Sequence, residues 1–587
     1  LRENKKDRYM LSASLNYKIL DWLTVSGRVS LDNANNDYTE KFYASTNTQL
    51  TEGSSRGLYG ITKTSDKQLY ADFLVSINKN FGEDWNLSAN IGGSFTDVRS
   101  DQMTVRGGIA DGSDAFPGEQ VGLTNYFAIQ NLSQKARRLQ EGWREQTQSI
   151  YASAELGYKS TYYLTLTGRN DWPSQLAGPN STSKSFFYPS VGLSVVLSEL
   201  MPNLNKDYLS YLKFRGSFAS VGSAFQRYLA NPRYEWSTSA NQWSVLTQYP
   251  MYSLKPERTN SFEIGFNARF LKYFELDATY YNAKTENQTF NPQLPINKYS
   301  KMYIQTGSVR NQGIELALNF ENTWRNFTWM SGLTYSMNKN KIESLADNVI
   351  NPITGELFSI PSLDMGGYAD LRFILREGGS MGDLYSRTDL RRDANGAIYM
   401  DESNNVYTQK IDNPDSYIKL GSVLPKGNLA WRNNFMWKNF HVGFMISARL
   451  GGVVFSRTQA VLDKFGVSEA SANARDNGFV LINGNDRINP ENWYTTVGST
   501  AVPQYYTYSA TNVRLQEASI GYTIPRKWLA NICDIKVSLI GRNLWMIYNK
   551  APFDPEAVAS TDNFYQGIDN FMMPSLRNVG FSLNFKF

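Results

Sequence analysis

The feature that most constrains the fold of this chain is a strict alternation of apolar with polar or small residues. Its clearest instance is the last eleven residues, 577–587, RNVGFSLNFKF. The apolar positions of this segment are Val579, Phe581, Leu583, Phe585 and Phe587. A period of two predicts a β-strand with one apolar face and one polar face. Such a strand can close a soluble β-sandwich, or it can close an outer-membrane β-barrel whose apolar face meets lipid.

The same alternation recurs along the chain and predicts about seventeen strands. The first two form a hairpin around a tight turn at Asp21-Trp22. The predicted strands lie at 11–19, 23–31, 69–77, 87–95, 150–158, 162–168, 191–197, 212–218, 264–270, 274–280, 314–320, 328–337, 429–437, 442–450, 513–522, 535–539 and 577–587. Near Glu517-Ala518 the alternation slips by one residue, which predicts a β-bulge.

The connections between these strands alternate between short turns and long loops. The long loops span approximately 33–67, 100–142, 170–188, 222–257, 285–311, 339–425, 451–511 and 547–575. Short turns at one end and long loops at the other are typical of outer-membrane barrels, whereas a soluble sandwich or propeller has no reason to segregate them. The pattern therefore favours an all-β, transmembrane antiparallel barrel in the bacterial outer membrane, with residues 1–587 as one partial barrel domain.

Composition excludes several other classes of protein. Mean hydropathy is −0.44, and no run of about 18 apolar residues suggests a membrane helix. Aromatic residues reach 14%, which suits the girdles of a barrel as well as sugar-binding surfaces. With one cysteine, the chain lacks the residues for an internal disulfide or a thiolate metal site, and a single histidine argues strongly against a His-based catalytic triad or a His-rich metal site. We therefore expect no enzyme, no cofactor and no metal site, and the mixed charges show no nucleic-acid footprint.

Strand parity predicts that the barrel is incomplete. If Phe587 ends in the periplasm, counting back seventeen strands makes the first strand run inward as well. Single-chain bacterial barrels normally have an even strand number and start in the periplasm. We therefore expect an odd number of strands before Leu1, supplied by an amino-terminal segment or by a second polypeptide. The segment 1–10 has no apolar core and is not a signal peptide.

Seven short motifs occur in order along the chain. They are YPSVG at 188–192, SLKPERTN at 253–260, TGSVRNQGIE at 306–315, EG at 377–378 followed by LY at 384–385, RL to GYTIP at 514–525, GRNLW at 541–545 and DPE at 554–556. Together they resemble the blocks of the SusC-like (RagA-like) TonB-dependent outer-membrane transporters of Bacteroidota. Thr306 departs from that pattern, because the family has asparagine there.

The resemblance implies a complete barrel of 22 strands, so that about five strands, an amino-terminal plug and a TonB box lie outside this sequence. It implies TonB-dependent uptake of oligosaccharides together with a SusD-like surface lipoprotein, or of oligopeptides in some members. The expected partners are this lipoprotein, the TonB complex through the missing segment, and outer-membrane lipids and lipopolysaccharide; a dimer of transporter–lipoprotein pairs is also compatible. An alternative of another class is a structural or adhesive barrel without active transport.

Trp172, Trp236 and Trp243 fall in the long loops and are the candidate contacts for cargo or lid. Aromatic faces stack on the apolar C–H side of sugar rings. The competing interpretation is loop-on-loop packing. It applies equally to the other loop aromatics, Tyr249, Trp493, Tyr494, Tyr505 and Tyr506.

Other polar residues receive structural interpretations. His441 is expected on the polar face, and Cys533 is expected to pack as a small residue. The acidic stretches 393–396 and 401–405 lack the spacing of a calcium loop and predict solvated turns, with calcium as the alternative. Carboxylates of the polar face are expected to pair with Arg269 or Arg325, or with residues of the plug; they are Glu263, Glu275, Asp277 and Glu315. The basic clusters 135–138 and 391–392 are expected at solvated surface or against lipopolysaccharide phosphates.

Overall fold

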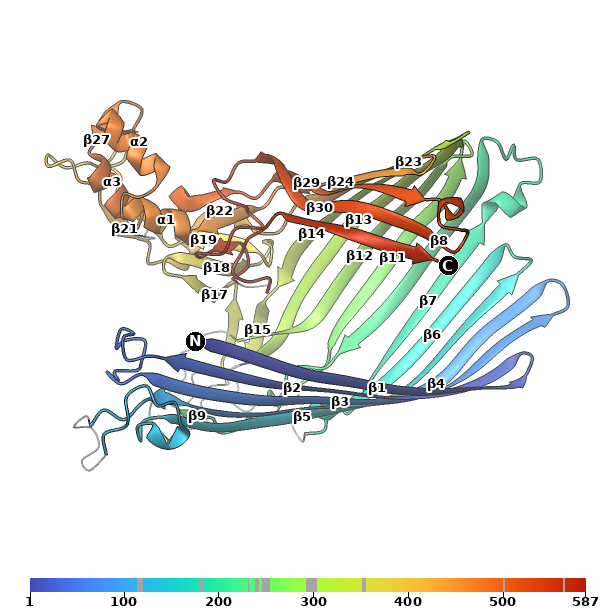
Figure 1. The fold of residues 1–587 in the computed structure, drawn as a ribbon, viewed down its shortest axis with the longest axis horizontal. Helices are drawn as coiled ribbons and strands as arrows, with labels where there is room; N and C mark the ends of the chain where they lie inside the picture. The colour runs from blue at the N-terminus through green and yellow to red at the C-terminus, as the bar shows by residue number, and fades with distance from the viewer. Residues whose placement is uncertain are drawn as a thin grey trace. The chain divides into compact units, whose positions relative to one another are not determined.

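Seventeen strands of the computed structural model form one antiparallel sheet (Figure 1). The structure describes residues 1–112, 120–178, 181, 183–230, 232–237, 242–244, 254–291, 303–350, 355–499, 502–562 and 565–587. The chain divides into two compact units. The first comprises Leu1–Gly192, Ala219–Arg258 and Gln293–Tyr303, and the second comprises Leu193–Phe218, Thr259–Pro292 and Ile304–Phe587.

The first unit is built from long hairpins. Its strands are β1 (Arg2–Leu20), β2 (Leu23–Phe42), β3 (Leu58–Phe81), β4 (Trp85–Gly108), β5 (Arg137–Tyr158), β6 (Tyr162–Pro173) and the start of β7 (Phe186–Val196). Val29 lies opposite Ala71, and Ala71 lies opposite Phe95, so apolar side chains share one face across β2, β3 and β4. On the other face Arg28 donates from Nε to Asp72 at 2.9 Å. The two faces therefore differ as the alternation predicts.

The second unit continues the same pattern. Its sheet strands are β8 (Leu209–Ser223), β11 (Glu257–Phe270), β12 (Phe274–Phe290), β13 (Ile304–Trp324), β14 (Phe327–Ser344), β23 (Gly427–Trp437), β24 (Phe440–Leu450), β29 (Asn512–Ile524), β30 (Asp534–Asn549) and β32 (Asn578–Lys586). In β32, Phe581 lies opposite Leu539 and Phe585 lies opposite Ile535, so both phenylalanines join the apolar face. Their side chains are 77% and 54% exposed.

Each of the seventeen predicted strands overlaps a strand of the sheet, but the observed strands reach further into the long connections. β2 runs to Phe42 and β3 starts at Leu58, so the first long connection is 43–57 instead of 33–67. The other long connections are 109–136, 174–185, 224–256, 291–303, 345–426, 451–511 and 550–577. The extensions are mainly polar, as in NANNDYTE at 33–40, so the alternation is weak there.

The bulge lies next to its predicted position. Glu517 faces Met445 and Leu515 faces Ile446, so Gln516 is the extra residue of β29.

A second local feature is a band of aromatic rings near the short turns of the second unit. Neighbouring rings in this band lie 4.8–6.0 Å apart, in the pairs Phe274–Phe320, Phe320–Trp329 and Trp329–Phe435. Such a band matches the girdle interpretation of the aromatic surplus.

Three helices lie in the connection 451–511 and were not predicted: α1 (Arg457–Lys464), α2 (Glu469–Asn477) and α3 (Pro490–Val497). The hydroxyls of Ser456 and Ser468 cap α1 and α2, and the Asn489 side chain caps α3. In the described part of the chain, no helix is long and apolar enough to cross a membrane.

Candidate functional site

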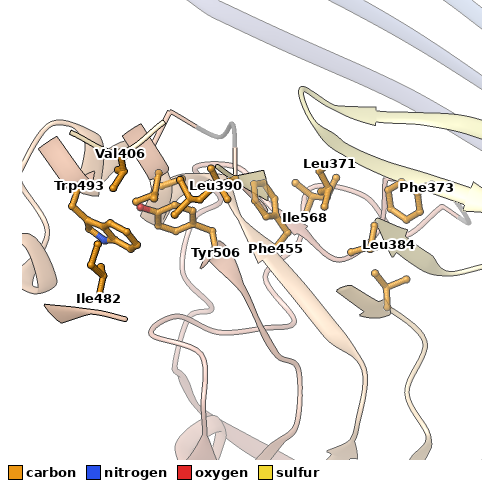
Figure 2. Packing of buried hydrophobic residues seen from close by; sticks show 14 of the residues in the cluster. Leu371, Phe373, Leu384, Leu390, Val406, Phe455, Ile482, Trp493, Tyr506 and Ile568 are labelled. Carbon is orange, nitrogen blue, oxygen red and sulfur yellow. The ribbon is translucent and has the colours of Figure 1, made fainter. Parts of the chain in front are cut away.

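Three long connections of the second unit pack into one small domain, here called the loop domain (345–426, 451–511 and 550–577). Its core includes Phe373 of β18 (Leu371–Arg376), Phe455 of β25 (Val453–Ser456), Trp493 of α3 and Ile568 of β31 (Ile568–Asp569). Figure 2 shows these side chains gathered among segments that are distant in sequence. Phe373 and Phe455 are fully buried, which contributes about 2–3 kcal/mol each. The loop domain is therefore a folded part of the molecule.

Short β-sheets connect the pieces of the loop domain. β17 (Ser362–Tyr368), β18, β19 (Asp383–Ser386) and β22 (Ile418–Ser422) form a four-stranded sheet within the first connection. β25 pairs antiparallel with β28 (Thr507–Ser509) and parallel with β31. Because β31 belongs to the last connection, backbone hydrogen bonds link the second and third connections.

Most of the described loop aromatics of this region are structural. Tyr506 is 2% exposed and Trp493 is buried, and the Trp493 ring makes an edge contact with Tyr505 at 5.3 Å. Burial raises the pKa of the Tyr506 phenol above its ordinary value. Loop-on-loop packing is therefore the correct interpretation for Trp493 and Tyr506. Tyr249 lies outside the described residues.

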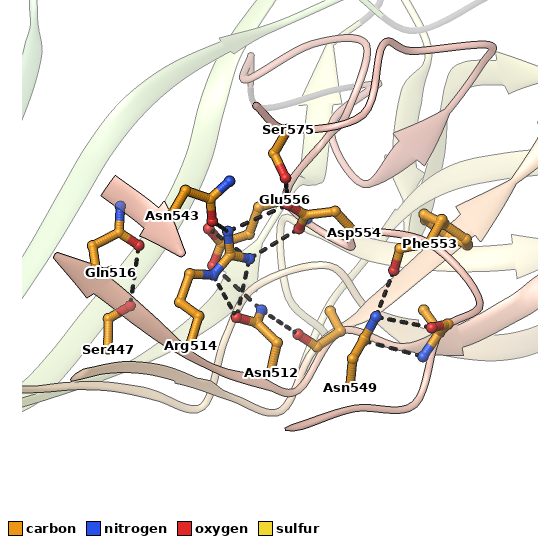
Figure 3. A network of polar contacts seen from close by, with 12 residues as sticks. Ser447, Asn512, Arg514, Gln516, Asn543, Asn549, Phe553, Asp554, Glu556 and Ser575 are labelled. Atoms are coloured by element: carbon orange, nitrogen blue, oxygen red, sulfur yellow. Dashed lines mark hydrogen bonds and ion pairs between the residues drawn. The ribbon is translucent and has the colours of Figure 1, made fainter. Parts of the chain in front are cut away.

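A buried polar cluster ties the last connection to the sheet (Figure 3). Arg514 of β29 is 4% exposed, and its Nη2 lies 2.9 Å from Asp554 and 3.2 Å from Glu556. Its Nε and Nη2 also donate to Asn512, and its Nη1 donates to Asn543 of β30 at 3.5 Å. A buried guanidinium is tolerated only when it is paired and hydrogen-bonded. The carboxylates of the last connection satisfy that requirement here.

The pKa of Asp554 reflects two opposing effects. Burial alone would raise it, but hydrogen bonds from Arg514 and Ser575 outweigh burial, so the pKa lies below its ordinary value. The Ser575 hydroxyl donates to the Asp554 carboxylate at 2.5 Å. This cluster joins three of the seven sequence motifs, because Arg514, Asn543 and Asp554 come from the last three motifs.

The TGSVRNQGIE motif is explained by close packing on β13. A Cβ added at Gly313 would lie 2.0 Å from the Met337 carbonyl oxygen, and one added at Gly307 would lie 1.9 Å from the Phe290 ring. Only glycine therefore fits at both positions. Between them, Arg310 donates from Nε to Glu343 at 2.5 Å.

A cavity of about 700 Å³ lies on the polar face of the second unit. Its charged lining residues are Arg215, Asp277, Glu315, Arg449 and Glu556. Arg215 bonds Asp277 at 2.7 Å, whereas Arg449 donates only to the Val423 carbonyl at 2.6 Å. Within the described residues neither Arg449 nor Glu315 forms an ion pair. Glu556 brings the last connection, and with it the Arg514 cluster, to the wall of this cavity.

The predicted ion pairs of the polar face are correct in part. Arg269 pairs with Glu275 at 3.4 Å, as expected. Asp277 pairs with Arg215 of β8, and neither Arg269 nor Arg325 takes that role. The prediction failed because Arg215 reaches Asp277 across intervening β11, and sequence alone does not give that lateral distance.

The three candidate tryptophans lie in the first unit. Trp236 of β9 (Trp236–Ser237) and Trp243 of β10 (Gln242–Trp243) are opposite residues of a small hairpin, with ring centroids 5.3 Å apart. Trp243 is 66% exposed. Trp172 of β6 lies opposite Gln148 on the face that carries Leu164 and Leu166, which is the apolar face. The structure thus joins Trp236 to Trp243 and places Trp172 on the membrane-type face.

The remaining polar candidates have local partners. The His441 Nε2 lies 2.9 Å from the Thr523 hydroxyl, and Cys533 is buried after a short turn. The carboxylates of Asp393 and Asp401 accept hydrogen bonds from backbone N–H groups two and four residues later, as expected of tight turns. In the basic clusters, Arg137 pairs with Glu52 at 3.4 Å.

The cavity, the loop domain and the Arg514 cluster were missed by the sequence analysis. Asn489-Pro490-Glu491 is a helix-start signal that could have revealed α3, since it combines a capping residue, a proline at the first helical position and an acid in the first turn. For the cavity and for the buried cluster the sequence carries no comparable signal, because both depend on residues from distant strands.

Comparison with known proteins gives one family. Residues 1–544 match the family model described as TonB dependent receptor-like, beta-barrel. TonB-dependent receptor P3 of Formosa agariphila is 26% identical over 557 residues, covering 87% of this chain and 52% of that protein. TonB-dependent receptor P26 of the same organism is 26% identical over 555 residues, with the same coverage. The chain thus spans about half the length of these curated relatives.

Solved structures show the same fold at low sequence identity. The RagAB peptide importer in its closed-closed state matches with a TM-score of 0.74 and 16% identity, covering all of this chain and 63% of that chain. Its open-open state matches with a TM-score of 0.73 and 16% identity, covering 62% of that chain. At this identity the likeness concerns the fold.

Proposed function

This chain belongs to the family of TonB-dependent receptor β-barrels of the outer membrane, and on that premise we propose that the full-length protein actively imports an oligomeric nutrient. The loop domain is the observation that carries this proposal. A barrel that served only as a structural wall has no need of a packed domain whose last connection also lines a charged cavity. In the proposed cycle, cargo binds at the loops and crosses the barrel when TonB displaces a plug supplied by the rest of the protein.

We propose a SusD-like surface lipoprotein as the partner of the long loops. The RagAB peptide importer, which shares this fold, has been solved in open-open and closed-closed states, and two such states would suit a lid that moves. The exposed Trp243 hairpin offers an apolar contact for such a lid or for cargo. A transporter of this kind has no catalytic role, and we propose none for this chain.

Oligosaccharide is the first candidate cargo. The Trp236–Trp243 pair supports it, since an exposed indole can stack on a pyranose ring. The register of Trp172 suits a membrane-interface girdle better than cargo contact.

Oligopeptide is the second candidate cargo, and the cavity favours it. Arg449 offers a guanidinium and Glu315 a carboxylate that lack ion-pair partners among the described residues. A peptide carries a terminal carboxylate and a terminal ammonium that match these groups, whereas a neutral glycan carries neither charge.

The first experiment tests active transport. Cells expressing the full-length protein are compared with cells in which its TonB-box segment is deleted, using uptake of labelled glycans and peptides. We expect uptake to fall to the level of cells without the transporter. Unchanged uptake would contradict active import and favour a structural or adhesive barrel.

The second experiment separates the two cargo classes. Trp243→Ala should weaken glycan uptake about 5- to 100-fold if one ring stacks on the sugar. Arg449→Gln should instead weaken peptide uptake if the cavity takes a carboxylate. Arg432→Gln, an exposed arginine of β23, is the matched control for Arg449 and should change neither.

A further inference from the structure

Three cations on neighbouring strands form a row on the apolar face of the first unit. This cation row lies where the run of apolar side chains on that face, here called the apolar band, ends toward the long loops. Lys67 of β3 lies directly opposite Arg99 of β4, and Arg99 lies directly opposite Arg144 of β5. Direct cross-strand partners share one face of a sheet. Toward the short turns, the same face of β3 continues with Leu69 and Ala71. The cation row therefore lies on the membrane-facing side, at the border between the apolar band and the long loops.

The charges of this row are only partly compensated by protein groups. Arg144 donates from its Nε to the two Asp97 oxygens at 3.1 and 3.0 Å. Within the described residues Lys67 and Arg99 form no ion pair, although Asp97, one row nearer the short turns, attracts Arg99 as well as Arg144. Like charges directly opposite each other destabilise a sheet. An external anion would remove that cost.

An apolar groove of about 690 Å³ lies on the same face toward the short turns, separated from the cation row by one row that contains Leu31, Leu69 and Asp97. Leu15 lies opposite Gly27, and Gly27 lies opposite Phe73, so a residue without a side chain separates two bulky ones. Val29 and Phe95 belong to the next row of the groove. A Cβ added at Gly27 would come no nearer than 3.9 Å to another atom, which means that the floor of the groove is open.

We propose that the cation row and the groove together bind one phosphorylated glycolipid of the outer leaflet, of the lipid A class. The phosphate lies on Lys67, Arg99 and Arg144, and an acyl chain lies in the groove over Gly27. Charge complementarity and position both support this occupant, since a lipid in the leaflet presents an anionic headgroup directly above apolar chains. The site is separate from cargo transport and does not depend on the cargo.

Known interaction energies are large enough to support lipid binding at this site. A basic residue near an anionic membrane surface contributes about 1 kcal/mol, and the arginine fork matches phosphate geometry. Lysine and arginine can also extend their aliphatic stems along apolar surface while the charge reaches the headgroup. The basic cluster 135–138 is a weaker candidate, because Arg137 already pairs with Glu52 and Arg138 donates to backbone carbonyls.

The test uses the delipidated full-length protein in detergent, titrated with bisphosphorylated lipid A and followed by native mass spectrometry. The variant Lys67→Gln/Arg99→Gln removes the two cations of the row that form no ion pair within the described residues. Gly27→Leu places a side chain in the groove, and its Cβ would come no nearer than 3.9 Å to another atom. The matched control Lys5→Gln/Lys63→Gln removes two cations of the same face that are already paired, with Glu3 and Asp37. Heat-modifiable migration on gels verifies that every variant is folded.

We expect the Lys67→Gln/Arg99→Gln variant to lose about tenfold or more in affinity. Gly27→Leu should also bind more weakly, while the control stays within about twofold of the parent protein. Equal binding of dephosphorylated lipid A, or unchanged binding by Lys67→Gln/Arg99→Gln, would overturn the proposal. Displacement of the lipid by inorganic phosphate would also overturn it, since the site would then bind a free anion.

Discussion

At the scale of single residues, Arg514 shows how short motifs that are far apart in the sequence act together. Its guanidinium is buried and uses carboxylates from the last connection as partners. Removing either the guanidinium or its carboxylate partners leaves an uncompensated charge in a site that excludes water. Three motifs that look independent in the sequence are therefore parts of one interaction.

Arg514→Gln tests this interaction. The variant leaves Asp554 buried without its cation, which should weaken attachment of the 550–577 segment by about 3–5 kcal/mol. Faster amide hydrogen exchange in that segment would report the loss. Arg542→Gln is the matched control: its exposed pair with Glu517 at 3.3 Å should be worth no more than about 1 kcal/mol. Equal exchange in both variants would contradict the role assigned to Arg514.

The lowered pKa of Asp554 predicts a dependence on pH. A carboxylate whose folded-state pKa is below its unfolded value of about 3.9 contributes stability that is present above that value. The contribution is lost as pH falls through the lower folded-state pKa. Protease cleavage within 550–577 should therefore accelerate below about pH 4. In Asp554→Asn the cleavage rate should be high at neutral pH and nearly independent of pH.

At the scale of elements, the strands of the sheet and the loop domain are stabilised in different ways. Strands of the sheet expose large apolar side chains on one face, as Phe581 and Phe585 do in β32, so their stabilisation depends on lipid and on cross-strand hydrogen bonds. The loop domain instead has a buried core of its own, centred on Phe455. It should therefore be possible to destabilise the loop domain without unfolding the sheet.

Phe455→Ala tests whether the loop domain can be destabilised while the sheet stays folded. Loss of a fully buried ring should cost the loop domain about 3–5 kcal/mol, while the heat-modifiable migration of the barrel stays unchanged. Limited proteolysis of the 457–499 segment measures the effect. Phe465→Ala, at an exposed position between α1 and α2, is the control and should leave cleavage unaltered. Loss of the folded barrel in Phe455→Ala would show that the two parts fold together.

At the scale of the whole molecule, the family assignment and the strand pattern agree. The family model covers residues 1–544, and the sheet contains seventeen strands, as the alternation predicted. The chain covers about half of its curated relatives, and we propose that the rest of the protein supplies the plug, the TonB contact and the remaining strands. Active import by the whole molecule is the proposed function, and the uptake experiments with the TonB-box deletion test it.

The sequence by itself determined the strands, their two faces and the short-and-long order of their connections. These are local properties: alternation marks a strand wherever one face meets lipid and the other meets water. The segment 577–587 is a clear example, and its alternation places Val579 and Phe581 on the same face as the structure does. The helices of the loop domain could have been found in part, from the Asn489-Pro490 start signal.

Only the tertiary structure decided which distant residues meet. The extensions of the strands carry little alternation, because most of their residues are polar, and backbone pairing defines them. Arg215 reached Asp277 from a different hairpin than expected, and Arg449 forms no ion pair among the residues that the structure describes. The burial of Trp493 and Tyr506 and the row of Lys67, Arg99 and Arg144 likewise depend on lateral neighbours. Lateral neighbours are set by strand register and by long-range packing, which a residue's own surroundings in the sequence do not encode.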